Sequence, residues 1–296
     1  MIQHSHAAKK PARVVITGGS GFIGKNIAAE LQRRGVEALP LSSAQLDLCA
    51  AGASAALSGL LRKDDALVIA SAVTPDKGRD ARSQMKNFTM GLALGDALEK
   101  TPCAHVIYLS SDAVYDDRVS LVNEATLPSP GSFYGIAHFG RERLITDALK
   151  KSGTPFLILR PSIIYGAGDT HNSYGPNRFF RAAAAGKISL FGGGQEKRDH
   201  VCIEDVCRLM AECLFRQSRG ILNVATGRSV PFFEVADKIQ KLFGGKVQVE
   251  PGPRSNPVTH RHYDITACLQ AFPDFSYTRL DQGLADTFKK IQTQSQ

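Results

Sequence analysis

Short apolar runs alternate with longer amphipathic stretches through the first half of the chain. The runs Arg13–Thr17, Ala66–Ala70, His105–Leu109 and Phe156–Arg160 predict buried strands, and Val36–Leu41 predicts a weaker one. Stretches long enough for helices lie between them, at 22–34, 51–62, 80–99 and 134–151. Uninterrupted apolar strands that alternate with helices favour a parallel sheet covered on both faces. The pattern therefore predicts a doubly wound α/β fold of the Rossmann type, with its ligands at the carboxyl ends of the strands.

The pattern loosens after Pro161. Residues 166–175 and 192–194 are rich in glycine, and 251–257 has the composition of a loop, whereas helical patterns return at 203–216, 231–243 and 279–290. We expect a dinucleotide-binding domain over 11–165, with returning segments around 197–230. Residues 166–296 are expected to form mainly a smaller substrate lobe.

Composition narrows the class of protein. The chain has 296 residues, 43% of them hydrophobic and 22% charged, which is typical of a soluble globular protein. No apolar run reaches the length of about 18 residues that a transmembrane helix needs, so we expect a cytoplasmic protein. Six cysteines without a C-x-x-C pair indicate reduced thiols and no metal site. The first ten residues lack the apolar core of a signal peptide, and we expect His4 and His6 in a disordered end.

The net charge of +8 raises the question of an anionic partner. Lysine and arginine are scattered along the chain rather than gathered in runs. A nucleic-acid binder needs its basic residues on one face, together with aromatic platforms. We therefore expect no nucleic-acid partner, and either an ordinary solvated surface or a basic cleft that attracts small anions such as nucleotides.

A glycine-rich loop joins the first predicted strand to the first predicted helix. Gly18, Gly21 and Gly24 are spaced as G-x-x-G-x-x-G within residues 17–24. One glycine makes the tight turn, one lets the backbone approach a pyrophosphate, and one allows close packing of helix on strand. Free N–H groups at the helix start then bind the phosphate charge. The loop predicts a site for NAD or NADP.

The choice between NAD and NADP stays open. A ribose-reading carboxylate is expected about 20 residues after the loop, but that region holds Ser42. Arg33 and Arg34 are near in sequence and could favour a 2′-phosphate. Asp47 follows slightly later, where it could contact the adenine or simply cap a loop.

Several motifs together resemble the extended short-chain dehydrogenase/reductase family of nucleotide-sugar epimerases, dehydratases and reductases. They are the glycine loop at 17–24, Asp47-Leu48, S-S-D-A-V-Y at 110–115, Y-G-I-A-H at 134–138, L-R-P at 159–161 with Y-G at 165–166, and R-D-H-V at 198–201 with E-D-V at 204–206. The resemblance covers nearly the whole chain, and its motifs are specific in combination.

The resemblance implies the catalytic residues. Tyr134 would be the acid/base and Ser111 would hydrogen-bond the reacting hydroxyl or carbonyl. A tyrosine with a pKa of about 10 needs nearby positive charge to act as a base near neutrality. The family supplies a lysine four residues later, one helical turn away, whereas this chain has His138. Histidine could still bond the nicotinamide ribose, but it would lower the tyrosine pKa only while protonated.

The resemblance also implies a wider set of binding residues. Cofactor contacts are expected from Gly18, Gly21, Phe22, Ile23, Gly24, Ser42, Asp47, Leu48, Ala70, Ser71, Ser110, Tyr134, His138 and Pro161. Substrate contacts are expected from Ser111, Asp112, Arg198 and Arg254, because a guanidinium can donate two parallel hydrogen bonds to a phosphate.

Two functions remain open. The first is NAD(P)-dependent epimerisation or keto-sugar reduction of a nucleoside-diphosphate sugar. Dehydration is disfavoured because Ala113 stands where the family's dehydratases carry a glutamate. The second is a non-catalytic or weakened dinucleotide sensor, since His138 replaces the lysine. A homodimer is expected from the resemblance alone.

Overall fold

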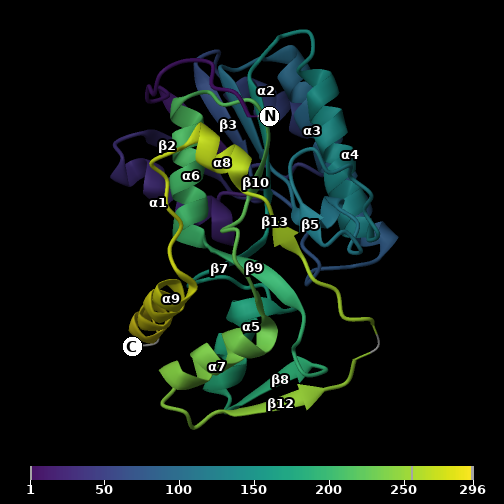
Figure 1. Ribbon diagram of the computed structural model, residues 1–296. Helices are drawn as coiled ribbons and strands as arrows, with labels where there is room; N and C mark the ends of the chain where they lie inside the picture. Colours follow the sequence, from purple (N-terminus) through teal and green to yellow (C-terminus); the bar gives the residue numbers. More distant parts are fainter. Residues whose placement is uncertain (1, 255, 295–296) are drawn as a thin grey trace.

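The computed structural model describes residues 2–254 and 256–294 (Figure 1). Its main sheet has six strands in the order β10-β6-β4-β3-β1-β2, and all the pairings are parallel. These strands are β1 (Arg13–Thr17), β2 (Glu37–Leu41), β3 (Asp65–Ile69), β4 (His105–Leu109), β6 (Phe156–Pro161) and β10 (Gly220–Val224). The predicted doubly wound parallel sheet is confirmed, and one edge strand, β10, comes from the second half of the chain.

Successive residues of β1 pack against opposite layers. Val14 and Ile16 belong to the apolar cluster on one face of the sheet, and Val15 belongs to the cluster on the other. All three side chains are fully buried. Because side chains alternate across a strand, burial on both faces requires the uninterrupted apolar run seen in the sequence.

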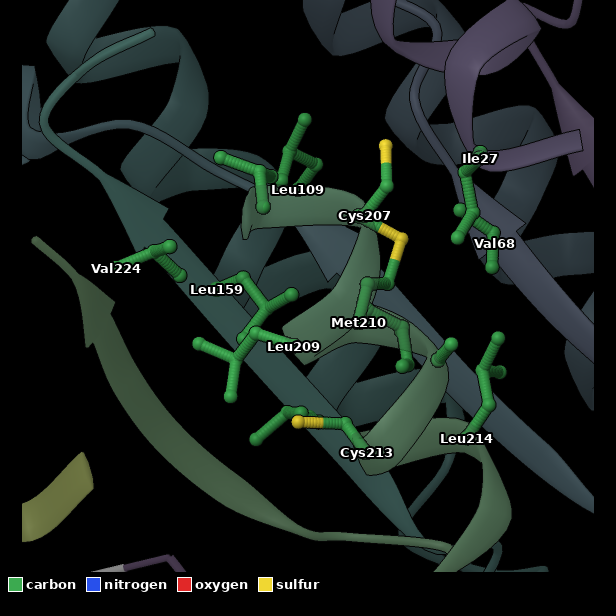
Figure 2. Close-up of a cluster of buried hydrophobic side chains, with 14 of the residues drawn as sticks. Ile27, Val68, Leu109, Leu159, Cys207, Leu209, Met210, Cys213, Leu214 and Val224 are labelled. Carbon is green, nitrogen blue, oxygen red and sulfur yellow. The ribbon is translucent and has the colours of Figure 1, made fainter. Parts of the chain in front are cut away.

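Helices cover both faces of the sheet. The helices are α1 (Phe22–Arg33) and α6 (Ile203–Phe215) on one face, and α2 (Ala53–Leu60), α3 (Ala81–Lys100) and α4 (Phe133–Ala148) on the other. Figure 2 shows Cys207, Met210 and Leu214 of α6 in the same cluster as Ile27 of α1 and Val68 of β3. The short helix α8 (Thr266–Ala271) packs beside β10. The segment containing α6 and β10 thus returns to the sheet.

A second lobe lies beyond the carboxyl ends of the strands (Figure 1). It contains α5 (Gly175–Ala184), β8 (Lys187–Phe191), α7 (Phe232–Leu242), β12 (Gln248–Gly252) and α9 (Leu280–Gln294). Strands β8 and β12 pair in parallel, and α5 and α7 share an apolar cluster with them. The predicted loop at 251–257 is wrong at its start, because β12 extends to Gly252. Position 255 lies outside the described residues.

Small sheets join the two lobes. One sheet contains β7 (Ile163–Tyr165), β9 (Lys197–Cys202) and β11 (Ser229–Pro231), and the other contains β5 (Leu121–Val122) and β13 (His262–Tyr263). A single 3-10 turn, η1 (Asp112–Val114), follows β4. Elements of two or three residues carry too little periodicity to be predicted from the sequence.

The N-terminal segment packs against the sheet edge. Gln3 forms an isolated antiparallel bridge with Arg219. The ring nitrogens of His4 lie 2.9 Å from the Ser218 hydroxyl and 2.9 Å from the Ala271 carbonyl oxygen. The expectation of a disordered end is wrong here, because contacts from β10 and α8 fix the segment.

The cysteines form no disulfide. Cys49 is exposed, and the other five are buried. Among the residues that the structure describes, no three His, Cys, Asp or Glu side chains are grouped closely enough to hold a metal ion. No helix in the same residues is both long enough and apolar enough to cross a membrane.

Candidate active site

The glycine loop lies between the end of β1 and the start of α1. Gly18 has φ of 74°, a left-handed conformation that favours glycine. A Cβ on Gly18 would lie 2.7 Å from the Ser71 backbone nitrogen, and one on Gly24 would lie 2.2 Å from the Gly18 carbonyl oxygen. Both glycines are therefore required by packing.

Gly21 is different, because it is exposed and its neighbours leave room. A Cβ there would meet only the Gly18 carbonyl oxygen, at 3.2 Å. Gly21 is the N-cap of α1, no side chain caps this helix, and its first turn has no acidic residue. An uncapped helix start beside an open backbone suits an anionic phosphate. The residues present fit the pyrophosphate of a dinucleotide.

The end of β2 approaches the glycine loop. The backbone N–H of Gly19 donates to the Leu41 carbonyl oxygen at 2.9 Å, which places Ser42 beside the loop. Asp47 accepts from the backbone N–H of Cys49 at 2.9 Å, so it caps a turn, and Leu48 is buried. Ser42 thus stands just after β2, where the family would carry the carboxylate that binds the ribose.

Arg33 and Arg34 do not belong to this site. They lie at the C-terminal end of α1, whereas the glycine loop precedes its N-terminal end. Arg33 pairs with Glu30 at 2.9 Å, and Arg34 pairs with Glu30 at 2.6 Å and with Glu212 at 2.7 Å. The proximity of these arginines in sequence therefore gives no support for a 2′-phosphate site.

Four further predicted cofactor residues lie at or just after the carboxyl ends of neighbouring strands. Ala70 and Ser71 follow β3, Ser110 follows β4, and Pro161 ends β6. The Ser71 hydroxyl lies 3.1 Å from the Thr17 hydroxyl, beside the glycine loop. The Ser110 hydroxyl instead donates to Glu142 at 2.6 Å within a buried network, so its side chain has a structural partner.

Ser111 and Tyr134 come together from β4 and α4. Ser132 caps α4 by accepting from the Gly135 N–H at 3.1 Å, which fixes where the helix begins. Gly135 packs on η1, because a Cβ there would lie 2.0 Å from the Ala113 carbonyl oxygen. This close packing of α4 on η1 brings the Tyr134 side chain near Ser111.

The pKa of Tyr134 is raised to about 12, mainly because burial disfavours the phenolate. The hydrogen bond from Ser111 opposes this rise, and so does the positive charge of Arg141. The negative charges of Asp112 and Asp76 add to the rise. The ligand-free site therefore keeps Tyr134 protonated.

His138 is buried and neutral. Its side chain is only 1% exposed, and burial together with the charge of Arg141 lowers its pKa to about 3. Nδ1 lies 2.6 Å from the Tyr108 hydroxyl, and the ring stands edge-on to Tyr134 with centroids 4.4 Å apart. His138 therefore brings no positive charge to Tyr134 at physiological pH. A protonated His138 that lowers the pKa of Tyr134 is not supported.

Asp112 lies next to Ser111 but is already held by the chain. Its Oδ2 accepts from the Tyr263 hydroxyl at 2.7 Å, and its carbonyl oxygen accepts from Arg261 at 3.2 Å. Tyr263 thus fixes the carboxylate that the sequence places among the substrate contacts, and the bond ties η1 to β13 of the C-terminal segment.

Arg198 and Arg254 converge on one carboxylate. Arg254 bonds Glu196 at 2.5 Å, and the nearest nitrogen of Arg198 lies 3.7 Å from the same side chain. Arg198 also donates to the Thr259 carbonyl at 2.7 Å, while Nε of Arg254 is buried without a partner. The structure brings together two arginines that are 56 residues apart, as a site for a diphosphate would need.

The sequence reasoning missed Arg141. This residue follows Tyr134 by seven positions, or two helical turns, and so lies on the same face of α4. It is completely buried, and its Nη1 donates to the Ser71 carbonyl at 2.8 Å. Its position three residues after His138 in the predicted helix could have indicated that it lies on the same face as Tyr134. Tyr108 was also missed, although its strand was predicted.

A hollow of about 770 Å³ lies elsewhere, between α4 and the outer strands β6 and β10. Leu127, Phe139, Phe156 and Ile221 are among the residues that line it. It shares no wall with the glycine loop or Tyr134, so its size does not make it the site of the chemistry.

The fold and the glycine loop define a dinucleotide-binding protein of the Rossmann class. The sequence model described as "NAD dependent epimerase/dehydratase family" matches residues 14–225. The chain therefore belongs to the NAD-dependent epimerase/dehydratase family. The resemblance seen in the sequence is confirmed, and so are the predictions of an enzyme and of a nicotinamide dinucleotide, NAD or NADP, as cofactor, of which the family description names NAD.

Solved structures share the whole architecture. MoeE5 with UDP-glucuronic acid and NAD has a TM-score of 0.84 at 22% identity, covering 96% of this chain and 100% of that one. A UDP-glucose 4-epimerase from Thermotoga maritima has a TM-score of 0.84 at 21% identity, with 96% and 100% covered. A UDP-N-acetylglucosamine 4-epimerase from Bacillus cereus has a TM-score of 0.79 at 22% identity, with 95% and 99% covered. At these identities the similarity establishes the fold.

Proposed function

We propose that this protein is an NAD-dependent epimerase of UDP-sugars. The observation that carries the proposal is the position of Tyr134 near Ser111, where the first turn of α4 packs on η1 at the carboxyl end of β4. A tyrosine and a serine hydroxyl that lie close together can both reach one sugar hydroxyl, and the tyrosine can exchange a proton with it. Structurally similar proteins support the same assignment, because one is described in complex with UDP-glucuronic acid and NAD and another as a UDP-glucose 4-epimerase.

The chemistry divides between the cofactor and the chain. NAD, held by the glycine loop, would supply the hydride acceptor for the sugar carbon and the donor for its return to either face of that carbon. In its ionised form, Tyr134 would take the proton from the hydroxyl on that carbon and give it back after the sugar has turned. Ser111 holds the same oxygen through its hydroxyl and stabilises the charge that develops there.

Arg198 of β9 and Arg254, which follows β12, bind the substrate. Arg198 and Arg254 flank Glu196, and each is part-buried. A diphosphate carries enough negative charge to compete with Glu196 for both guanidinium groups, which bind phosphate oxygens in pairs. Binding through the diphosphate leaves the sugar free to rotate in front of Tyr134, so that either face of the reacting carbon can be presented, as epimerisation requires.

Isomer conversion tests this function. The purified protein with NAD is incubated separately with UDP-glucose, UDP-glucuronic acid and UDP-N-acetylglucosamine, and the 4-epimers are resolved by chromatography. We expect conversion of at least one sugar nucleotide, lost in Tyr134→Phe and reduced in Ser111→Ala. No conversion of any of them, by protein shown to hold NAD, would contradict the proposal.

Keto-sugar reduction is the second candidate. The S-S-D-A-V-Y-D sequence at 110–116 resembles the corresponding loop of the family's keto-sugar reductases. Both reactions use the same serine and tyrosine, but a reductase must release its oxidised cofactor. Stoichiometric consumption of NADH with a 4-keto sugar nucleotide, without any epimer formed, would favour reduction.

A sensor without turnover is the third candidate, and the neutral, buried state of His138 favours it. The His138→Lys variant separates this candidate from the enzymes. Turnover only in that variant would favour the sensor, whereas turnover by the natural chain eliminates it.

Exposed apolar residues on α3 and α4 support a homodimer. Met85 and Leu92 of α3 and Phe133 and Ile136 of α4 are each more than 40% exposed. The two helices pack side by side, so a second copy could cover both. Light scattering should give twice the mass of the chain, and Leu92→Glu should reduce it to that of one chain.

A further inference from the structure

Arg141 differs from the other buried arginines of the described residues. Arg13 pairs with Asp65, Arg160 pairs with Glu142, and Arg261 pairs with Asp117. Arg141 is 0% exposed, yet its hydrogen bond goes to the Ser71 carbonyl oxygen rather than to a carboxylate. Its Nε and Nη2 are buried without a partner. A buried charge without a counter-ion is unfavourable for folding, so this arrangement calls for a functional reason.

A chain of aromatic rings connects Arg141 to Tyr134. The guanidinium carbon lies 4.9 Å from the centre of the Tyr108 ring. The Tyr108 hydroxyl lies 2.6 Å from Nδ1 of His138, and the His138 ring contacts the Tyr134 ring at 4.4 Å between centroids. Tyr134, His138 and Arg141 share one face of α4, since they are spaced by four and three residues. The charge therefore lies behind the acid/base, in an interior from which water is excluded.

The neighbouring helix makes room for this arginine. A Cβ on Gly91 of α3 would lie 2.9 Å from Cγ of Arg141. The absence of a side chain at Gly91 lets the arginine stem pass between α3 and α4. Its Nη1 then reaches Ser71, whose hydroxyl lies beside Thr17 at the start of the glycine loop. Arg141 thus ties the acid/base helix to the cofactor loop.

We propose that Arg141, rather than His138, supplies the positive charge of the Tyr134 site and acts as its positioning residue. The inference rests on the proposed function, because it assigns Arg141 a part in the proton transfer of Tyr134. Arg141 acts through the electric field on the Tyr134 oxygen and through the position of Ser71.

The groups facing Tyr134 agree with this assignment. Ser111 and Asp112 approach from the end of β4, Asp76 from the segment before α3, and Tyr174 from the start of α5. On α4 itself, His138 is neutral and Arg141 is charged. Both carboxylates raise the pKa of Tyr134, and Arg141 lowers it. At the helical separation of about 10 Å, one charge in an effective dielectric of about 20 changes a pKa by about one unit.

The experiment measures the ionisation of Tyr134 directly. Phenolate absorbance is followed against pH in the NAD-loaded protein and in Tyr134→Phe, and the difference gives the titration of Tyr134. The same pair is prepared with Arg141→Met, Arg141→Gln and Arg141→Lys. Met and Gln remove the charge, whereas Lys retains it but shortens the reach to Ser71.

We expect the Tyr134 titration to move about one unit higher in the Met and Gln variants and to stay in place in the Lys variant. Adding His138→Lys to Arg141→Met should bring it back. An unchanged titration in a folded Met or Gln variant would overturn the proposal. If neither neutral variant folds, the Arg141→Lys variant decides. A rise of one unit in the pKa of Tyr134 in that variant would overturn the proposal, because the positive charge is still present there.

Turnover provides a separate readout. With an active sugar nucleotide, Arg141→Met should lower kcat about tenfold near neutral pH, with KM little changed, and the loss should shrink as the pH rises. A uniform loss at all pH values would show a purely structural role and overturn the proposal. Absence of turnover in the natural chain would count against the epimerase function, while the absorbance titration would still decide the role of Arg141.

Discussion

The Tyr108 hydroxyl lies 2.6 Å from Nδ1 of His138, in a part of the core where both side chains are at most 1% exposed. Burial raises the pKa of Tyr108 and lowers that of His138, so both partners are neutral at pH 7. The bond occupies one ring nitrogen of His138 and fixes its plane against Tyr134. His138 is therefore a packing element of the acid/base site, and the positive charge lies one turn further along α4.

Replacement of Gly24 by alanine should disrupt the cofactor loop. The new Cβ would lie 2.2 Å from the Gly18 carbonyl oxygen, so the loop or α1 must move. We expect a loss of about 1–3 kcal/mol in the free energy of unfolding, as for other overpacked sites, and loss of NAD binding. Chemical denaturation and calorimetric titration measure the two effects.

Gly21→Ala is the matched control for that variant. Its nearest contact would be 3.2 Å, so the fold should be retained. NAD affinity should still fall, because a methyl group at the N-cap of α1 obstructs the phosphate. Equal destabilisation by the two substitutions would show that packing does not distinguish these glycines.

Glu142→Gln should destabilise the protein strongly. Glu142 pairs with Arg160 at 2.6 Å, and both side chains are no more than 3% exposed. Removing one partner leaves an uncompensated buried charge, which costs about 3–5 kcal/mol. Thermal unfolding should show a large drop in Tm, whereas Asp147→Asn, which breaks the exposed pair with Lys150, should leave Tm unchanged.

Stability should fall as the pH drops from about 6.5, partly because of His200. Its ring is 4% exposed, neither nitrogen has a partner, and burial lowers its pKa to about 3. The unfolded chain binds a proton below about pH 6.5 and the folded chain does not, so unfolding becomes more favourable as the pH falls.

Between pH 7 and pH 5, the free energy of unfolding should fall by about 2 kcal/mol less in His200→Phe than in the natural protein. Denaturant unfolding at the two pH values measures this difference, and the Phe232 ring nearby can pack against the new side chain. An identical pH dependence in the variant would mean that His200 is protonated in the folded protein.

Arg254→Met should weaken substrate binding without affecting the cofactor. Charged hydrogen bonds contribute about 1.5–3 kcal/mol, so KM for a UDP-sugar should rise about tenfold to a hundredfold. Lys187→Met removes the same charge from the same lobe, where Lys187 pairs with Glu250 at 2.6 Å, and should leave KM unchanged. A similar rise in both variants would indicate a general charge effect rather than a diphosphate site.

The sequence predicts the main sheet well because its strands are buried on both faces. The predicted Arg13–Thr17 and His105–Leu109 agree with β1 and β4 residue for residue. The short strands β5 and β13 between the lobes were missed, since they have two residues each and are stabilised by pairing over 140 residues apart. Long-range pairing of this kind leaves no periodic signal.

The candidate site is predicted unevenly for a similar reason. The glycine loop is local in sequence, and its spacing alone reveals the turn. The neutrality of His138 depends instead mainly on burial, and its hydrogen-bonding partner Tyr108 comes from β4, so only tertiary packing reveals this environment. The ion pairs of Arg33 and Arg34 with Glu30 are local to α1, whereas the pair of Arg34 with Glu212 of α6 is tertiary.

The most direct test of the account is to ask what the glycine loop binds. Nucleotide released from the purified, denatured protein is identified by mass spectrometry, and protein freed of nucleotide is titrated with NAD and NADP. We expect NAD, either released from the protein or bound in the titration, with weaker binding of NADP because Arg33 and Arg34 lie at the far end of α1 and pair with Glu30. If no nucleotide is released and neither compound binds at millimolar concentration, the glycine loop is not a dinucleotide site.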